Sequence, residues 1–196
     1  DLETVARLAF VEMLQTGITT VGEFHYLHHR PDGRTYDDPN ELAHRVIRAA
    51  RDVGMRIVLL RAAYHRGGFQ QDLGDRQRRF AEDDVDDYVH RLERLEADWA
   101  DASDVSVGLA PHSIRAVPEE WLRALSDVAG GRPVHIHASE QRRELEESRA
   151  EYGATPIRVL DELGLLDSTD TTIIHATHAT DDEIGRLARS EASVCG

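Results

Sequence analysis

The feature of the sequence that most constrains the fold is a repeated alternation of short apolar runs with longer segments of helical periodicity. Near-continuous apolar strands that alternate with helices are typical of a parallel sheet covered by helices, so the sequence predicts an α/β fold. Five runs rich in β-branched and aromatic residues are predicted to be strands, and a sixth begins near the end: Ile18 to Tyr26, Arg56 to His65, Val105 to His112, Pro133 to Ala138, Thr171 to Ala176, and Ala192 to Cys195.

The predicted helices begin at recognisable signals. In the run DPNE, Asp38 is expected to be the N-cap, Pro39 the first helical residue and Glu41 the partner in a capping box. This helix should run to about Val53 and stop at Gly54. The other expected helices are Leu2 to Leu14, Asp84 to Trp99, Pro118 to Val128, segments from Glu140 and from Pro156, and Asp181 to Arg189.

Polar side chains gather at the carboxyl ends of the predicted strands: His25, Tyr26, Tyr64, His65, His112, His137 and His175. Barrel enzymes build their active sites at this end, whereas an open doubly wound sheet usually carries a glycine-rich first turn, which is lacking here. We therefore expect a partial (β/α)8 TIM-type barrel of about five βα units. Since a complete barrel takes ~250 residues, residues 1–196 are expected to form a single incomplete barrel domain.

The composition excludes several classes of function. All 23 basic side chains are arginine, so a Schiff-base lysine, a Walker-type phosphate loop and a carboxylated-lysine metal bridge are excluded. The net charge of -14 argues against nucleic acid or an anionic membrane as the main partner. No run approaches the ~18 apolar residues of a membrane span, and the single cysteine, Cys195, allows no internal disulfide. A cytoplasmic location is the simplest expectation.

The hexapeptide HIHASE, residues 135–140, is the most informative motif. His135 and His137 project to one face of a strand, with His137 at the mouth and His135 one layer deeper. Glu140 follows just beyond the strand end. Metal-assisted hydrolysis needs a histidine ligand and a nearby general base, and this spacing supplies both. Two buried histidines followed by a glutamate that begins a helix would give the same pattern, so the motif alone leaves both interpretations open.

Two neighbouring strand ends add candidate residues at the same edge. His175 closes the run TTII in the motif HATH, where it would share a substrate with His137, whereas His178 is expected to face solvent. In PHSIRAV, His112 faces the same mouth. Arg115 follows it and offers a planar fork that matches a carboxylate, so a small anionic substrate is plausible; an arginine paired with a surface glutamate is the plainer interpretation.

The run EFHYLHH resembles a metal cluster by its number of histidines but not by their spacing. Tyr26 and His28 share a face of the strand, and His25 and His29 do not lie on it. Tyr26 is expected to donate a hydroxyl hydrogen bond at the site, and His28 and His29 are expected to be loop residues.

Taken in order, GEFHYLHH, DPNEL, HSIRAV, HIHASEQ and HATH resemble the formimidoylglutamate deiminase family of the amidohydrolase superfamily, along essentially the whole chain. The resemblance implies a distorted (β/α)8 barrel with a small flanking β-domain and one zinc ion. It also implies hydrolytic deimination of N-formimidoyl-L-glutamate to N-formyl-L-glutamate and ammonia, in histidine degradation. The implied roles are zinc ligand for His137, proton shuttle for Glu140, orientation or deprotonation of water for His175, and substrate contacts for Tyr26, His112 and Arg115.

The chain departs from that family by omission. The His-x-His pair of the family's first strand, the aspartate of its last strand and the β-domain are all missing. We therefore expect a fragment that binds zinc weakly or not at all and has no useful deiminase activity alone. Its open sheet edges favour a homo-oligomer. Two alternatives stay open: another amidohydrolase that deaminates an amidine or an aminated ring, and a truncated barrel without catalysis.

Overall fold

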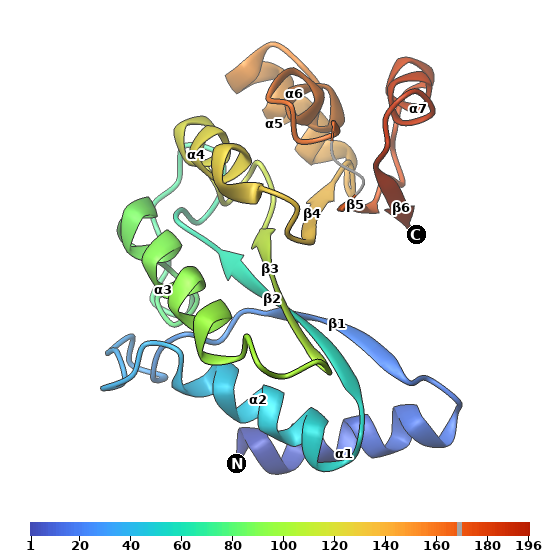
Figure 1. Cartoon of the computed structure of the whole chain (residues 1–196). Coiled ribbons are helices and arrows are strands. Elements are labelled where there is room, and N and C mark those ends of the chain that lie inside the picture. Colours follow the sequence, from blue (N-terminus) through green and yellow to red (C-terminus); the bar gives the residue numbers. More distant parts are fainter. Residues whose placement is uncertain (168–169) are drawn as a thin grey trace.

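The computed structural model describes residues 1–167 and 170–196, and within these residues the strands form a single six-stranded sheet. All neighbouring strands are parallel, and they lie side by side in chain order (Figure 1). The parallel α/β sheet predicted from the sequence is therefore confirmed. The strands are β1 (Thr20–His25), β2 (Arg56–Ala63), β3 (Val105–Pro111), β4 (Val134–Ala138), β5 (Thr171–His175) and β6 (Ser193–Cys195).

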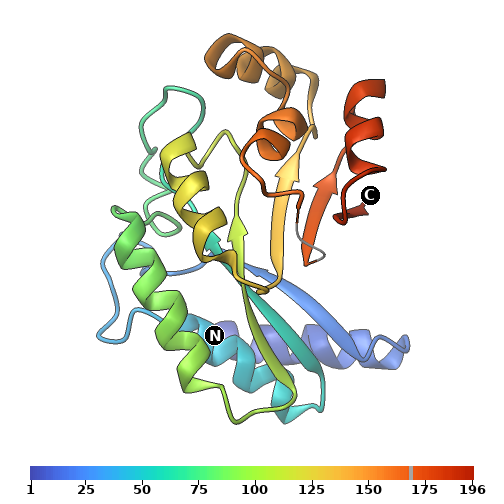
Figure 2. The ribbon, with the colours of Figure 1, turned by 45° about the horizontal axis from the view of Figure 1, so that its top comes forward.

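Helices connect the strands and cover one face of the sheet. Figures 1 and 2 show α2, α3 and α4 along this face, with α5 and α6 beyond α4 and with α1 alongside α2. In the described part of the chain, no helix is long and apolar enough to cross a membrane. The helices are α1 (Leu2–Gln15), α2 (Glu41–Asp52), α3 (Val85–Asp98), α4 (Glu119–Ala129), α5 (Arg142–Tyr152), α6 (Pro156–Glu162) and α7 (Asp181–Leu187).

The sheet is curled, and its two faces bury different sets of residues. Alternate residues of a strand point to opposite faces. On β2, Leu59 belongs to the main core beneath the helices, whereas Leu60 packs against Phe24 on the concave face. The curl brings β1 close to β4 across that face. A Cβ placed on Gly22 of β1 would lie 3.7 Å from Cε1 of His135 on β4. The concave face is therefore the interior of a partial barrel, as predicted.

The start of α2 differs from the sequence prediction. Its N-cap is Asn40, no side chain caps it, and the helix begins only at Glu41. Asp38 accepts a hydrogen bond from the Asn40 backbone N–H at 3.0 Å, in the turn before the helix. The Asn40 side chain bonds inward, to the Arg91 carbonyl and the Arg61 guanidinium, and the residue is 1% exposed. These long-range contacts, which no local signal contains, replace the predicted capping box.

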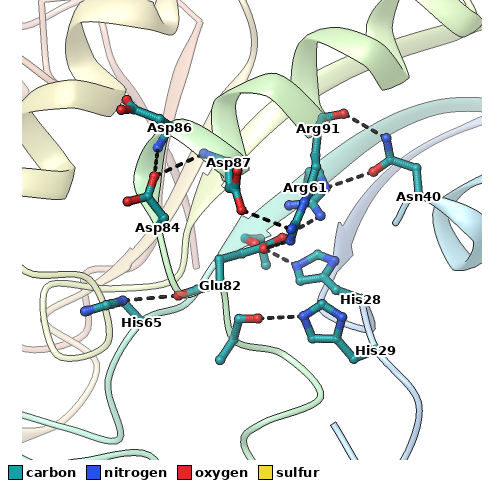
Figure 3. Close-up of polar contacts among 12 residues, drawn as sticks. His28, His29, Asn40, Arg61, His65, Glu82, Asp84, Asp86, Asp87 and Arg91 are labelled. Carbon is teal, nitrogen blue, oxygen red and sulfur yellow. Dashed lines mark hydrogen bonds and ion pairs between the residues drawn. The ribbon is translucent and has the colours of Figure 1, made fainter. Parts of the chain in front are cut away.

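A buried ion pair joins β2 to the loop that follows it (Figure 3). The Arg61 guanidinium lies 2.5 Å from the Glu82 carboxylate, and both side chains are fully buried. Arg91 from α3 pairs with the other oxygen of Glu82. The Tyr88 hydroxyl donates a hydrogen bond to the Arg61 carbonyl at 2.6 Å. Moving the loop away from the sheet would separate the pair and leave an uncompensated buried charge. The pair therefore holds this loop against the sheet.

Two histidines of the loop after β1 also belong to this buried region (Figure 3). His28 and His29 are loop residues, as predicted, and both are buried. Each buried ring is satisfied by donating Nε2–H to a backbone carbonyl. His28 bonds the carbonyl of Ala62 on β2, and His29 bonds that of Ala81, both at 2.8 Å. Both backbone amides donate to the Arg79 carbonyl. The loops after β1 and β2 are therefore fastened to each other.

The buried rings of His25 and His28 predict a loss of stability in acid. Burial lowers the pKa of His25 to about 3, with Arg61 adding to the shift, and it lowers the pKa of His28 well below its usual value of 6.5. The histidines of the unfolded chain take up protons near pH 6.5, whereas the buried rings of the folded chain stay neutral until the pH approaches 3. Stability is therefore full above pH 6.5 and is lost as the pH falls toward 3. Chemical denaturation should show a free energy of unfolding that is lower near pH 5 than near pH 7, with His25 contributing about 2 kcal/mol of the difference.

His25→Phe tests this prediction directly. The Nε2 atom of His25 has no hydrogen-bond partner among the described residues, so the substitution removes the titrating ring together with its hydrogen bond to the Leu27 backbone. The variant should lose about 2 kcal/mol less than the wild type between the two pH values. His90→Gln, at an exposed position of α3, is the control and should keep the wild-type pH dependence. The same acid loss in His25→Phe as in the wild type would contradict the prediction.

Candidate active site

Three histidine rings meet at the carboxyl end of the sheet, each from a different strand. His112 follows β3, His137 lies near the end of β4, and His175 ends β5. The ring centroids of His112 and His137 are 5.0 Å apart. Those of His137 and His175 are 5.3 Å apart, with planes inclined by 29°. The structure thus brings together the three histidines that the sequence placed at one sheet edge.

The carbonyl of His112 fixes the tautomer of the His137 ring. It accepts the His137 backbone N–H at 3.1 Å and the ring Nδ1–H at 2.8 Å. Because a carbonyl oxygen only accepts, Nδ1 carries the proton and Nε2 keeps its lone pair. Burial lowers the pKa of His137, which favours the neutral ring. A neutral imidazole whose other nitrogen donates to a backbone carbonyl is suited to bind a metal ion.

Glu140 lies between a histidine and an arginine. One carboxylate oxygen is 3.8 Å from Nε2 of His175, and the other is 3.4 Å from the Arg115 guanidinium. The three side chains are 26% to 37% exposed, so a small ligand can reach them. Arg115 pairs with a glutamate, as the plainer interpretation expected, but this glutamate is the predicted proton shuttle. The arrangement combines groups that can move protons with a group that can bind a carboxylate.

The backbone is strained where these side chains emerge. The φ angles of Ser139, His175 and Ala176 are +55°, +78° and +51°, values that residues other than glycine rarely adopt. The Ala176 N–H donates to the Ala138 carbonyl at 3.0 Å, and the His178 N–H donates to the Ser139 carbonyl at 2.8 Å. Such strain persists only where surrounding contacts enforce it, and it concentrates at functional sites. The ends of β4 and β5 are thus held together in an unusual backbone conformation.

Glu144, which sequence analysis did not identify, holds the backbone of Glu140. From the third position of α5, its carboxylate accepts the Glu140 backbone N–H at 2.9 Å. Glu144 is 2% exposed, and burial raises the pKa of its carboxyl. A glutamate in the first turn of a helix often bonds backwards to a preceding N–H. The four-residue spacing of the two glutamates before a helical pattern was the available signal.

Aromatic side chains surround His112 on the concave face. The Tyr26 and Tyr64 rings lie 5.5 Å and 5.0 Å from the His112 ring, measured between centroids. Phe24 lies 4.5 Å from the His137 ring. Burial lowers the pKa of His112 to about 3, with a smaller contribution from His137, so its ring is neutral at physiological pH. Tyr64 and Phe24 were not predicted site residues, although Tyr64 was placed at a strand end.

The predicted motifs contain two further histidines, His135 and His178. His135 shares the concave face of β4 with His137, one layer deeper, as the alternation of the strand requires. His178 is partly exposed, and its backbone N–H is bonded to the Ser139 carbonyl just beyond the end of β4.

The described side chains supply only part of what a zinc site requires. A catalytic zinc site normally uses three protein ligands. Over residues 1–167 and 170–196, no group of three or more His, Cys, Asp or Glu side chains could hold a metal ion. His137 fits as one ligand, since its Nε2 lone pair is free of the carbonyl contact. The described residues therefore offer a part of a zinc site and do not complete one.

Comparison with known sequences gives consistent results. The profile described as the Amidohydrolase family matches residues 1–196. The chain is 40% identical to a formimidoylglutamate deiminase of Pseudomonas aeruginosa over 194 residues, which are 98% of this chain and 42% of that protein. It is 30% identical to a 5-methylthioadenosine/S-adenosylhomocysteine deaminase of Symbiobacterium thermophilum over 190 residues, 96% of this chain and 38% of that protein. The chain thus spans about two fifths of the length of these relatives.

Solved structures share the fold. A crystal structure of an amidohydrolase from Brucella melitensis matches with a TM-score of 0.91 and 36% identity, over 98% of this chain and 43% of the other. A mutant atrazine chlorohydrolase from Arthrobacter aurescens, complexed with zinc and atraton, matches with a TM-score of 0.83 and 26% identity, over 98% and 41%. The curled sheet described above is therefore an amidohydrolase-like partial barrel.

The incomplete ligand set predicts weak zinc binding by the 196-residue chain. One histidine ligand cannot enforce the coordination of a catalytic zinc site. After incubation with zinc and extensive dialysis, elemental analysis should find far less than one zinc per chain. The same low content is expected for His137→Gln and for the exposed control His90→Gln. One zinc per chain that survives dialysis and disappears only in His137→Gln would contradict this prediction.

Proposed function

The chain belongs to the amidohydrolase family, and from this premise we propose that its site belongs to an enzyme that hydrolyses N-formimidoyl-L-glutamate to N-formyl-L-glutamate and ammonia. Because the chain spans about two fifths of its curated relatives, the activity is proposed for the whole protein. The 196 residues alone are expected to be inactive, since the residues that the structure describes do not complete a zinc site.

The observation that carries the proposal is the position of Glu140, with its two oxygens near His175 and Arg115. The substrate has a formimidoyl group to be hydrolysed and carboxylates to be bound. A carboxylate beside an imidazole can transfer protons, and an arginine can recognise a carboxylate. The 40% identity to a formimidoylglutamate deiminase supports the same assignment.

In the proposed reaction, His175 orients the hydrolytic water and takes a proton from it. The water oxygen adds to the formimidoyl carbon, the C=N double bond becomes single, and a tetrahedral intermediate forms. Glu140 relays two protons to the terminal nitrogen, one from the protonated His175 and one from the hydroxyl of the intermediate, then the bond between carbon and that nitrogen breaks and ammonia leaves. The remaining hydroxyl loses its proton and becomes the formyl carbonyl. One water is consumed for each ammonia released.

Other residues of the site hold the substrate. Arg115 binds a carboxylate of the glutamate portion through its planar guanidinium. Tyr26 donates a hydrogen bond from its hydroxyl to the substrate. Burial raises the pKa of this hydroxyl, which keeps the donor protonated. The neutral ring of His112 bonds a further polar group. These three side chains therefore fix the formimidoyl carbon beside His175 and Glu140.

His137 is the proposed zinc ligand of this chain, through the Nε2 atom that the His112 contact leaves free. When bound, zinc supplies Lewis-acid activation of the water. The structural relative complexed with zinc supports the choice of metal.

A second candidate function is deamination of an aminated ring. The 30% identity to a 5-methylthioadenosine/S-adenosylhomocysteine deaminase favours it, and so does the aromatic surface formed by Phe24, Tyr26 and Tyr64. Such a substrate presents a ring for stacking and does not require Arg115. Arg115 therefore separates the two candidate functions.

Ammonia release by the whole protein with zinc tests the proposal. Turnover of N-formimidoyl-L-glutamate is expected for the wild type, and Glu140→Gln should lower kcat by about 10³-fold, because it removes the proton donor. Arg115→Met should raise KM for this substrate by about tenfold or more. Glu162→Gln, an exposed glutamate on α6, makes the same chemical change elsewhere and should behave as the wild type.

The alternatives give different results in the same assay. Ammonia from 5-methylthioadenosine but not from N-formimidoyl-L-glutamate, with no effect of Arg115→Met, would favour the ring deaminase. Near-wild-type activity of the isolated 196-residue chain would contradict the requirement for the whole protein. Full activity of Glu140→Gln would contradict the proposed mechanism.

A further inference from the structure

Arg66, which follows β2 in the chain, has no role in the site described so far, yet it contacts the segment that carries Arg115. Its Nε donates to the Arg115 carbonyl at 2.8 Å, and a terminal nitrogen donates to the Ile114 carbonyl at 2.9 Å. On the other side, the guanidinium donates to the Glu151 carboxylate at 2.7 Å and to the Tyr152 hydroxyl at 2.9 Å. Arg66 therefore connects the end of α5 to the backbone of Arg115.

The environment of Arg66 suits a fixed connection. The side chains of Arg66 and Glu151 are each 15% exposed, and the guanidinium lies 5.5 Å from the centre of the Phe69 ring. The planar guanidinium presents several donors in a rigid arrangement, so it can bond two carbonyls and a carboxylate at once. A lysine cannot reproduce this fork.

The backbone around Arg66 strengthens the connection. The amides of His65 and Arg66 both donate to the Ala116 carbonyl, at 2.9 Å and 3.0 Å. With the two side-chain bonds, three consecutive carbonyls, from Ile114 to Ala116, are bonded to His65 and Arg66 in the segment that follows β2. The turn that presents Arg115 is therefore held along its length.

The direction of the Arg115 side chain depends on this hold. Its guanidinium lies 3.4 Å from Glu140, and its buried Nε has no hydrogen-bond partner among the described residues. With no bond to Nε, the side chain is aligned by its backbone and by the contact of its terminal nitrogen with Glu140. We propose that Arg66 is a positioning residue for substrate recognition, which fixes the backbone of Arg115 so that its guanidinium meets a substrate carboxylate; this rests on the proposed function.

Helix α5 carries the supports of both Arg115 and Glu140. Its first turn supplies Glu144, which holds the Glu140 backbone, and its last turn supplies Glu151 and Tyr152, which hold Arg66. The group that binds the substrate carboxylate and the group that transfers protons are therefore positioned by one helix. This shared support fixes the relative positions of Arg115 and Glu140, so that both can contact one substrate.

Substrate selectivity of the whole protein tests the proposal. The comparison is between N-formimidoyl-L-glutamate and formamidine, which has the reacting group but no carboxylate. Arg66→Met should lower the ratio of their kcat/KM values by about tenfold, mainly by raising KM for the carboxylated substrate. Arg66→Lys keeps the charge near Glu151 and loses the fork, so it should fall between Arg66→Met and the wild type.

A double-substitution cycle shows whether Arg66 acts through Arg115. In an Arg115→Met background, Arg66→Met should change the selectivity ratio by less than about twofold, because the group that it positions is gone. Arg132→Met is the matched control: Arg132 also joins a carboxylate and a backbone carbonyl, but at the opposite end of the sheet. Its selectivity ratio should equal that of the wild type.

Amide hydrogen exchange of the 196-residue chain supplies a readout that does not depend on activity. Exchange over residues 113–117 should be about tenfold faster in Arg66→Met and unchanged in Arg132→Met. A wild type that releases no ammonia from either substrate would contradict the proposed function, while the exchange result would still test the hold of Arg66. Equal losses of kcat/KM for both substrates, or unchanged exchange over residues 113–117, would overturn the positioning role.

Discussion

The two hydrogen bonds that the His112 carbonyl accepts from His137 are the constraint on which the rest of the site depends. One bond continues the sheet from β3 to β4, and the other is donated by Nδ1–H of the His137 ring, so it selects the tautomer protonated on Nδ1. Parallel strands present their carboxyl ends at one edge, so the same carbonyl that joins two strands also leaves Nε2 of the ring unprotonated at that edge. His175 then stacks on this ring from β5. The chemistry of the site thus follows from the pairing of the sheet.

The contacts outside the barrel interior hold the parts that the sheet does not fix. The buried pair of Arg61 and Glu82 fastens the loop after β2, and the rings of His28 and His29 fasten the loop after β1. Charged and polar groups in these positions are stable only when they are paired, which makes the loop conformations specific. Strain in the backbone at His175 is tolerated for the same reason, because neighbouring hydrogen bonds leave it little freedom.

Local pattern was sufficient to predict the strands, because each strand is a short apolar run. The alternation of these runs with helices predicted the parallel sheet, and a parallel sheet places His112, His137 and His175 at the same edge. Features that depend on distant partners were not predictable in this way. The burial of His28 depends on a carbonyl 34 residues away, and the contact between Arg66 and Tyr152 spans 86 residues. Neither pairing leaves a periodic signal in the sequence. The same limit explains the N-cap of α2, which a long-range contact of Asn40 determines.

The tautomer of His137 is the most direct test of this account, and nitrogen-15 NMR of the histidine-labelled 196-residue chain measures it. The account predicts a neutral ring protonated on Nδ1, with an unprotonated Nε2, assigned by loss of the signal in His137→Gln. His28 provides an internal control, since its ring donates Nε2–H to a carbonyl and should show the opposite tautomer. An Nε2-protonated ring at His137, or rapid exchange between the two tautomers, would contradict the claim that the His112 carbonyl prepares this ring to bind a metal ion.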